Sequence, residues 1–341
     1  MVPKAAAIEF AGTDLLEHPA VRACRRLHPE FAKPDAVENL KAKHKSAICR
    51  ITGIGPNHSS IIAKRCLGET ARIERTIYER VLPCLPVSTL RYYGFLEDED
   101  PQFCWLFLED GGNDPYSPSV PAHVALGSTW LGLLHASAHR VEAAASLPER
   151  GPRHYLEHLR QGRDAIRRSL DNPALSTQAV AVFSRITALY DFVESRWPEL
   201  AGFCRSFPQT VVHGDFAERN IRVRHTPGGL VLLPFDWETA GWGVPAVDLA
   251  KCPDLSLYRT VAAQQCPELE TENLHRLSQI GIVFRSLAGL WWRCAYFEFE
   301  WFEEYLYDFV SFETRMINAL HALGMSAALK AQSRNSFEVS P

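Results

Sequence analysis

The segment VVHGDFAERNIRVRHTPGGLVLLPFDWETAGWGVPAVDLAK, residues 211–251, is the most informative part of this sequence. A His-Gly-Asp triplet ends at Asp215, Asn220 follows five residues later, and Asp236 stands at the end of an apolar run. The Pro-Gly-Gly at 227–229 predicts a hairpin between the amide and the second acid. Asn220 and Asp236 are therefore expected near the ends of adjoining strands, with Asp215 in the loop just before them.

These three side chains are suited to holding a divalent cation and a hydroxyl group close together. Carboxylate and amide oxygens are hard ligands, and they are the type that Mg²⁺ prefers in proteins. The spacing of Asp215, Asn220 and Asp236 therefore predicts a site where two acids and one amide converge on a single point.

The whole pattern of HGD, Asn, an apolar run ending in Asp, and then GVPAVDLA resembles the aminoglycoside phosphotransferase and choline kinase family, whose members are relatives of the protein kinases. The resemblance implies an α+β, two-lobed, protein-kinase-like fold with a small β-rich N-lobe and a larger, mainly helical C-lobe. It also implies an enzyme that uses ATP and Mg²⁺ to phosphorylate a hydroxyl group of a small molecule.

The resemblance assigns a role to each residue of the pattern. Asp215 matches the catalytic aspartate that orients and deprotonates the acceptor hydroxyl, and Asn220 and Asp236 match the residues that hold Mg²⁺ on the nucleotide phosphates. Asp248 matches a buried aspartate that braces the catalytic loop through backbone hydrogen bonds. For His213 we expect packing and hydrogen bonding within the loop, and not proton transfer.

The first third of the chain contains matches to the nucleotide side of the family's site. Lys64, on a short predicted strand, resembles the kinase lysine that pairs with the α- and β-phosphates. Glu74, ten residues later in a predicted helix, matches the glutamate that holds this lysine. The sequence around Glu109 and Gly111 resembles the family's hinge, where backbone groups meet the nucleotide base.

The expected phosphate loop differs from that of protein kinases, because residues 40–48 (LKAKHKSAI) contain no glycine. We expect Lys43 and Lys45, together with Ser46, to supply side-chain contacts where backbone N–H groups act in protein kinases. A solvated basic turn is the alternative interpretation for any one of these residues.

Hydrophobic periodicity predicts a β-rich first third followed by a mainly helical remainder. Strands are expected at 47–51, 61–63, 89–95 and 103–108, and helices at 70–82, 124–145, 153–171, 177–196, 271–297 and 299–323. The corresponding domains are an N-lobe over 1–110, a C-lobe over 111–328 and a flexible tail over 329–341.

Composition excludes several functional classes. With 36 basic and 40 acidic residues the net charge is −4, so the chain has no general field for polyanions and no nucleic-acid partner is expected. Nine cysteines without a CxxC pair disfavour structural zinc and a disulfide framework and favour a reducing cytoplasm. The uncharged stretch between Asp114 and Arg140 begins with a proline-rich turn, so no membrane segment is expected.

The acceptor is expected to be a small molecule. Only eleven residues separate Asp236 from Asp248, which leaves no room for the activation segment that presents a peptide in protein kinases. Acids interleave with aromatics in the last predicted helix, which favours an amine-bearing acceptor held by charge and cation–π contacts. Glu300 and Glu304, with Glu238, are the candidate residues, although an ordinary amphipathic helix explains the same pattern.

Several alternatives remain open from the sequence. An aminoglycoside-like antibiotic is the favoured acceptor, and choline, ethanolamine, homoserine or an amino sugar are the alternatives. The alternative outside the enzymes is a pseudokinase, which binds nucleotide without transferring phosphate. A monomer or a homodimer is expected.

Overall fold

The computed structural model describes residues 9–10, 13–43, 46–263, 269–295, 297 and 305–325. The chain forms two compact units, and each unit draws on separate parts of the sequence. The first unit contains residues 1–130, 140–147 and 215–240, and the second contains residues 131–139, 148–214 and 241–341. The expected domain boundaries at residues 110 and 328 remain predictions.

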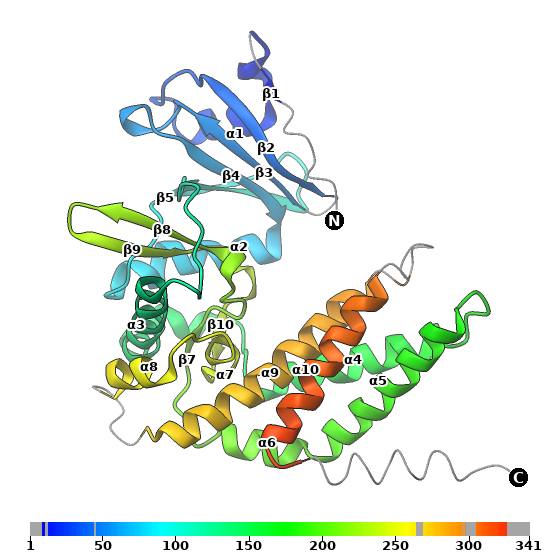
Figure 1. The fold of residues 1–341 in the computed structure, drawn as a ribbon. Helices are drawn as coiled ribbons and strands as arrows, with labels where there is room; N and C mark the ends of the chain where they lie inside the picture. The colour runs from blue at the N-terminus through cyan, green and yellow to red at the C-terminus, as the bar shows by residue number, and fades with distance from the viewer. Residues whose placement is uncertain are drawn as a thin grey trace, which may run out of the picture. The chain divides into compact units, whose positions relative to one another are not determined.

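The first unit is built on a six-stranded antiparallel sheet with strand order β1-β2-β3-β4-β6-β5 (Figure 1). Its strands are β1 (Glu9–Phe10), β2 (Ala36–Lys43), β3 (Ser46–Thr52), β4 (Ile61–Leu67), β5 (Tyr92–Glu97) and β6 (Phe103–Glu109). The four strands expected from the sequence are confirmed, whereas β2 was not expected. Its sequence, AVENLKAK, is polar, and within residues 36–42 only Val37 is buried in the core, so the alternation of a half-buried strand is weak.

The two faces of this sheet carry different helices. Successive residues of a strand point to opposite faces, so Ala63 and Lys64 diverge. Ala63 belongs to the apolar core formed with α1 (Pro19–Leu27). Lys64 lies on the face that packs against α2 (Gly68–Thr76), where it contacts a residue of that helix. The alternation along β4 therefore directs one charged side chain toward α2.

A β-hairpin also belongs to the first unit. It consists of β8 (Ile221–Thr226) and β9 (Gly229–Pro234), and the first residue of β8 pairs with the last residue of β9. Gly229 has φ +112°, a backbone conformation that side chains disfavour, which explains the glycine at this turn. Because Asn220 precedes β8 and Asp236 follows β9, the predicted hairpin and the position of both residues at its open end are confirmed.

The second unit is mainly helical, with a two-stranded antiparallel sheet of β7 and β10. In the described residues its elements are α4 (Pro152–Ser169), α5 (Thr177–Ser195), α6 (Trp197–Cys204), β7 (Thr210–Val212), β10 (Gly241–Gly243), α7 (Ala246–Leu249), α8 (Leu255–Ala262), α9 (Thr271–Cys294) and α10 (Leu306–Ala322). The long helix α9 packs against α4, α7 and α10 (Figure 1). Helix α3 (Pro121–Ser137) contributes residues to both units.

The helix expected over 124–145 is wrong in its second half. Helix α3 ends at Ser137 and is followed by 3-10 turns at Ala138–Arg140 and Glu142–Ser146. The buried Val141 between the two turns has an extended backbone, so packing overrides the helix propensity of the alanine-rich segment that follows. Helices α6 and α8 were not expected, and residues 299–304 of the last predicted helix lie outside the described residues.

Among the described residues, no helix combines the length and the apolar character needed to span a bilayer.

Candidate active site

Lys64 is the centre of a partly buried charge cluster in the first unit. Its Nζ donates to Oε1 of Glu74 at 2.5 Å and to Oδ1 of Asp236, and it lies 3.8 Å from Oε2 of Glu238. Glu74 comes from α2, whereas Asp236 and Glu238 come from the segment after β9. The expected Lys64–Glu74 pair therefore exists, and Asp236 joins it.

Burial and charge oppose each other in this cluster. Burial raises the pKa of Glu74 to about 7, although the Lys64 ammonium acts in the opposite direction. Burial lowers the pKa of Lys64, but the carboxylates around it outweigh that effect and hold it well above its usual value. The ammonium is therefore charged at neutral pH, whereas burial makes the Glu74 carboxyl harder to ionise than an exposed one.

Asp236 is held in an unusual backbone conformation. Its φ of 68° and ψ of 59° lie in the left-handed region, which few residues other than glycine adopt. The 3-10 turn Trp237–Thr239 begins directly after it and carries Glu238 back toward α2. A strained backbone of this kind is kept only where the surrounding contacts hold it in place, and it occurs most often at functional sites.

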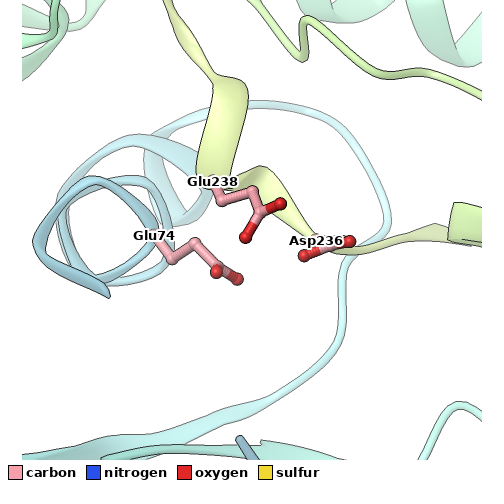
Figure 2. A group of neighbouring side chains, drawn as sticks. All are labelled: Glu74, Asp236 and Glu238. Carbon is pink, nitrogen blue, oxygen red and sulfur yellow. The ribbon is translucent and has the colours of Figure 1, made fainter. Parts of the chain in front are cut away.

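Three carboxylates converge at this point. One oxygen each of Glu74, Asp236 and Glu238 lies within 4.8 Å of the others, and Figure 2 shows the three side chains turned toward one another from two segments. Burial and then the neighbouring Asp236 raise the pKa of Glu238, so negative charge is already crowded here. A set of hard oxygen donors with excess negative charge fits a divalent cation such as Mg²⁺.

Asp215 and Asn220 form a second pair in the same unit. The Asn220 amide donates from Nδ2 to the backbone O of Asp215 at 3.0 Å and to its Oδ2 at 2.9 Å. The backbone O of Asn220 accepts from the N–H of Phe235 at 2.9 Å. Asn220 thus connects the loop of Asp215 to the residue that directly precedes Asp236. Because its NH₂ group serves Asp215, its amide oxygen is the atom left to act as a metal ligand.

Asp248 and His213 form a buried network in the second unit. The carboxylate of Asp248 accepts the backbone N–H of His213 at 2.7 Å and that of Gly214 at 3.0 Å. His135 Nε2 lies 3.3 Å from the same carboxylate, and its Nδ1 lies 3.1 Å from the Tyr258 hydroxyl. Burial raises the pKa of Asp248, but the groups around it, His135 first, outweigh burial and lower it. Asp248 therefore fixes the backbone immediately before Asp215.

The predicted hinge contacts β8 through two arginines. Arg224 donates to Oε1 of Glu109 at 2.6 Å and to the backbone O of Asp110 at 2.8 Å. A Cβ on Gly111 would lie 3.3 Å from the side chain of Arg222, so the two segments approach closely. The side chain of Glu109 is thus engaged by Arg224, and base contact by the Glu109 and Gly111 backbone remains a prediction.

The remaining predicted residues divide into two groups. Lys43 ends β2 and pairs with Ser46 at the start of β3, so the glycine-free segment joins two strands of the sheet. Lys45, Glu300 and Glu304 lie outside the described residues. A nucleotide contact from the β2–β3 connection and an acceptor contact from the last predicted helix both remain predictions.

Sequence reasoning missed two contributors to the site. His135 carries no local signature, because its partner Asp248 lies 113 residues away. Arg219 is in contact with Oδ2 of Asp215. The spacing of four residues in the HGDFAERN segment was the available signal for Arg219.

Comparison with protein families identifies the chain. The model of the phosphotransferase enzyme family, APH, matches residues 57–300, which is more than half of the sequence. The chain belongs to this phosphotransferase family. The resemblance seen in the 211–251 segment is thereby confirmed for this APH-family protein. No curated protein sequence gives a significant match.

Solved structures share the fold of this APH-family protein at low sequence identity. A choline kinase from Cryptosporidium parvum is 13% identical with a TM-score of 0.57, covering 87% of this chain and 92% of that one. A GDP complex of aminoglycoside 2′-phosphotransferase-IIIa is 13% identical with a TM-score of 0.58, covering 86% and 97%. Spectinomycin phosphotransferase with ADP and spectinomycin is 10% identical with a TM-score of 0.55, covering 83% and 89%. The expected protein-kinase-like α+β fold is confirmed.

Proposed function

We propose that this protein transfers the γ-phosphoryl group of ATP, with Mg²⁺, to a hydroxyl group of a small polar molecule. The observation that carries the proposal is the assembly in one unit of Lys64, Glu74, Asp236 and Glu238, with Asn220 joining Asp215 to the hairpin that bears Asp236. Membership of a phosphotransferase family supports it.

On the nucleotide side, Lys64 binds phosphate oxygens, and Glu74 keeps its ammonium in place. Asp236 and Glu238, with the amide oxygen of Asn220, are the residues that would hold Mg²⁺. When bound, Mg²⁺ would neutralise part of the negative charge on the phosphate oxygens. We therefore place Glu238, expected at the acceptor, on the metal side of the site, because it lies beside Asp236 and Lys64.

On the acceptor side, Asp215 accepts the proton of the attacking hydroxyl. A bond forms between the acceptor oxygen and the γ-phosphorus, the bond from that phosphorus to the β–γ bridging oxygen breaks, and ADP leaves. Asn220 fixes the Asp215 carboxylate from the hairpin side. Most of the acceleration comes from positioning and electrostatics, because phosphoryl transfer requires little covalent work from the protein.

For the acceptor we propose a small amine-bearing molecule, with an aminoglycoside-like compound favoured. Choline, ethanolamine, homoserine and amino sugars are the alternatives. The structural relatives are named as a choline kinase, an ethanolamine kinase and a spectinomycin phosphotransferase, which supports this range. The second candidate function is a nucleotide-binding pseudokinase. The glycine-free sequence at residues 40–48 is the observation that favours it.

The test is a transfer assay with ATP or GTP radiolabelled in the γ-phosphoryl group, across aminoglycosides, amino alcohols and amino sugars. The wild-type protein is expected to label at least one of these acceptors in a Mg²⁺-dependent manner, and Asp215→Asn is expected to label none. A wild-type protein that binds nucleotide but neither labels an acceptor nor hydrolyses ATP would instead be a pseudokinase.

A further inference from the structure

Arg219 lies directly beside the proposed catalytic acid. It occupies the middle of the 3-10 turn Glu218–Asn220. Its Nη2 contacts Oδ2 of Asp215, the oxygen that also accepts from Nδ2 of Asn220. The Asp215 side chain is 13% exposed and that of Arg219 is 68% exposed. The guanidinium therefore reaches from solvent onto an enclosed carboxylate.

The backbone that carries Arg219 is fixed on both sides. The N–H of Asn220 donates to the backbone O of Ala217 at 2.8 Å, which closes the turn. Nη1 of Arg222 donates to the backbone O of Arg219 at 3.3 Å. An exposed ion pair usually contributes little to stability. The Arg219–Asp215 pair is therefore expected to matter for catalysis and not for stability, because Asp215 is the acid assigned to the acceptor hydroxyl.

The chemistry of guanidinium suits the charge that develops during phosphoryl transfer. A guanidinium presents five N–H donors in a planar fork. Within the described part of the chain, the Arg219 side chain donates only to Asp215. In a loose transition state, negative charge spreads over the three equatorial oxygens of the transferred group. The attacking hydroxyl oxygen must contact Asp215. The phosphoryl group that it attacks therefore passes close to the guanidinium of Arg219.

We propose that Arg219 is a further catalytic residue, donating to an equatorial oxygen of the phosphoryl group as it moves to the acceptor. The inference rests on the proposed function. Contact with Asp215 places the guanidinium before transfer begins, and its other donors meet the charge that appears during transfer. Lys64 binds the nucleotide phosphates in the ground state, whereas Arg219 acts mainly in the transition state.

The experiment compares turnover with nucleotide affinity in Arg219→Ala and Arg219→Lys. Turnover is measured as Mg²⁺-dependent ATP hydrolysis and as transfer to any acceptor found by the labelling screen, and affinity is measured with the ATP analogue AMP-PNP. Because the alanine variant lacks a preorganised, positively charged hydrogen-bond donor, its kcat is expected to fall on the order of a hundredfold, with AMP-PNP affinity nearly unchanged. Lysine retains the charge without the fork, so an intermediate rate is expected.

Chemical rescue separates catalysis from loop stability. Guanidinium chloride at millimolar concentration is expected to restore part of the activity of Arg219→Ala, while potassium chloride at equal ionic strength is not. Arg167→Ala is the matched control, because Arg167 is an exposed arginine paired with Asp191 on another helix. That variant is expected to keep the wild-type rate. Melting curves will confirm that all variants are folded.

The outcomes distinguish this inference from the proposed function. An active wild type with an equally active Arg219→Ala variant would overturn the role of Arg219 alone. A parallel loss of kcat and AMP-PNP affinity without rescue by guanidinium would also overturn it. A wild type that neither hydrolyses ATP nor labels an acceptor would overturn both the proposed function and this inference.

Discussion

The ammonium group of Lys64 lies 2.5 Å from Oε1 of Glu74, and the Glu74 side chain is completely buried. Removing one member of a buried ion pair leaves an uncompensated charge, which typically lowers stability by about 3–5 kcal/mol. We therefore expect Lys64→Met to destabilise the protein by this amount and Lys64→Met/Glu74→Gln to recover part of the loss. Chemical denaturation of the single and double variants measures the coupling. Strictly additive effects would contradict the pairing.

The raised pKa of Glu74 predicts a pH dependence of stability. Its pKa is about 7 in the folded protein against an ordinary value of 4.5, so between these values the folded state binds more protons than the unfolded state. The free energy of unfolding contributed by this group is present below pH 4.5 and is lost as pH rises through about 7. The slope is at most about 1.4 kcal/mol per pH unit.

Denaturation of wild type and Glu74→Gln between pH 4.5 and 8 tests this dependence. Relative to the glutamine variant, the wild type is expected to lose stability as pH increases. The difference between the two proteins isolates Glu74 from the other titrating groups. A constant difference across the range would show that burial does not raise its pKa.

Glu238 is expected to control metal affinity. Its carboxylate lies beside Asp236 and Glu74, so Glu238→Gln removes one hard donor and part of the negative charge. We expect the Mg²⁺ concentration that half-saturates nucleotide binding to rise on the order of tenfold. Glu218→Gln is the control, since Glu218 is an exposed acid in the turn before Asn220. Equal Mg²⁺ dependence in the two variants would place Glu238 outside the metal site.

His135 is expected to act as a positioning residue through Asp248. In His135→Phe the buried carboxylate loses one partner, which is expected to lower the free energy of unfolding by about 1–3 kcal/mol. Because Asp248 holds the backbone of His213 and Gly214, kcat should fall while AMP-PNP affinity is retained. Tyr258→Phe keeps the His135–Asp248 contact and serves as the control. Unchanged kcat in His135→Phe would refute the positioning role.

Gly281 is expected to be essential for the packing of α9 against α7. A Cβ at this position would lie 1.8 Å from the backbone O of Ala246, and neither backbone can move without disrupting its helix. Gly281→Ala is expected to destabilise the protein by about 3 kcal/mol or more. Gly202→Ala, whose Cβ would meet Arg205 at an ordinary 3.5 Å, should be neutral or stabilising by up to about 1 kcal/mol. Thermal and chemical denaturation compare the two variants.

Local sequence was sufficient to predict the hairpin that positions Asn220 and Asp236. A Pro-Gly-Gly turn between the alternating segment IRVRHT and the apolar run LVLLP sets the register, and the register brings both ends together. The pair of Lys64 and Glu74 was predicted only through the family resemblance, because a lysine and a glutamate ten residues apart usually form nothing more than a solvated surface. These features depend on residues that are close together in the chain.

Two of the missed features, the contact of Glu238 with Lys64 and the role of His135, depend on long-range packing, whereas Arg219 lies only four residues from its partner Asp215. Glu238 lies beside Lys64 although 174 positions separate them in the sequence, and no local sequence pattern predicts that these two segments will be in contact. The same holds for His135, since a single buried histidine in a helix has no distinguishing spacing. Strand β2 was missed because the polar Asn39 lies on the same face as the buried Val37, and a bulge between Asn39 and Lys41 interrupts the alternation.

Calorimetric titration of AMP-PNP into wild type and Asp236→Asn, each with and without Mg²⁺, most directly tests whether this cluster holds a metal–nucleotide complex. The wild type is expected to bind at least about tenfold more tightly with Mg²⁺. In Asp236→Asn the difference between the two conditions should disappear. Equal wild-type affinity with and without the metal, or an undiminished Mg²⁺ effect in the variant, would contradict the account.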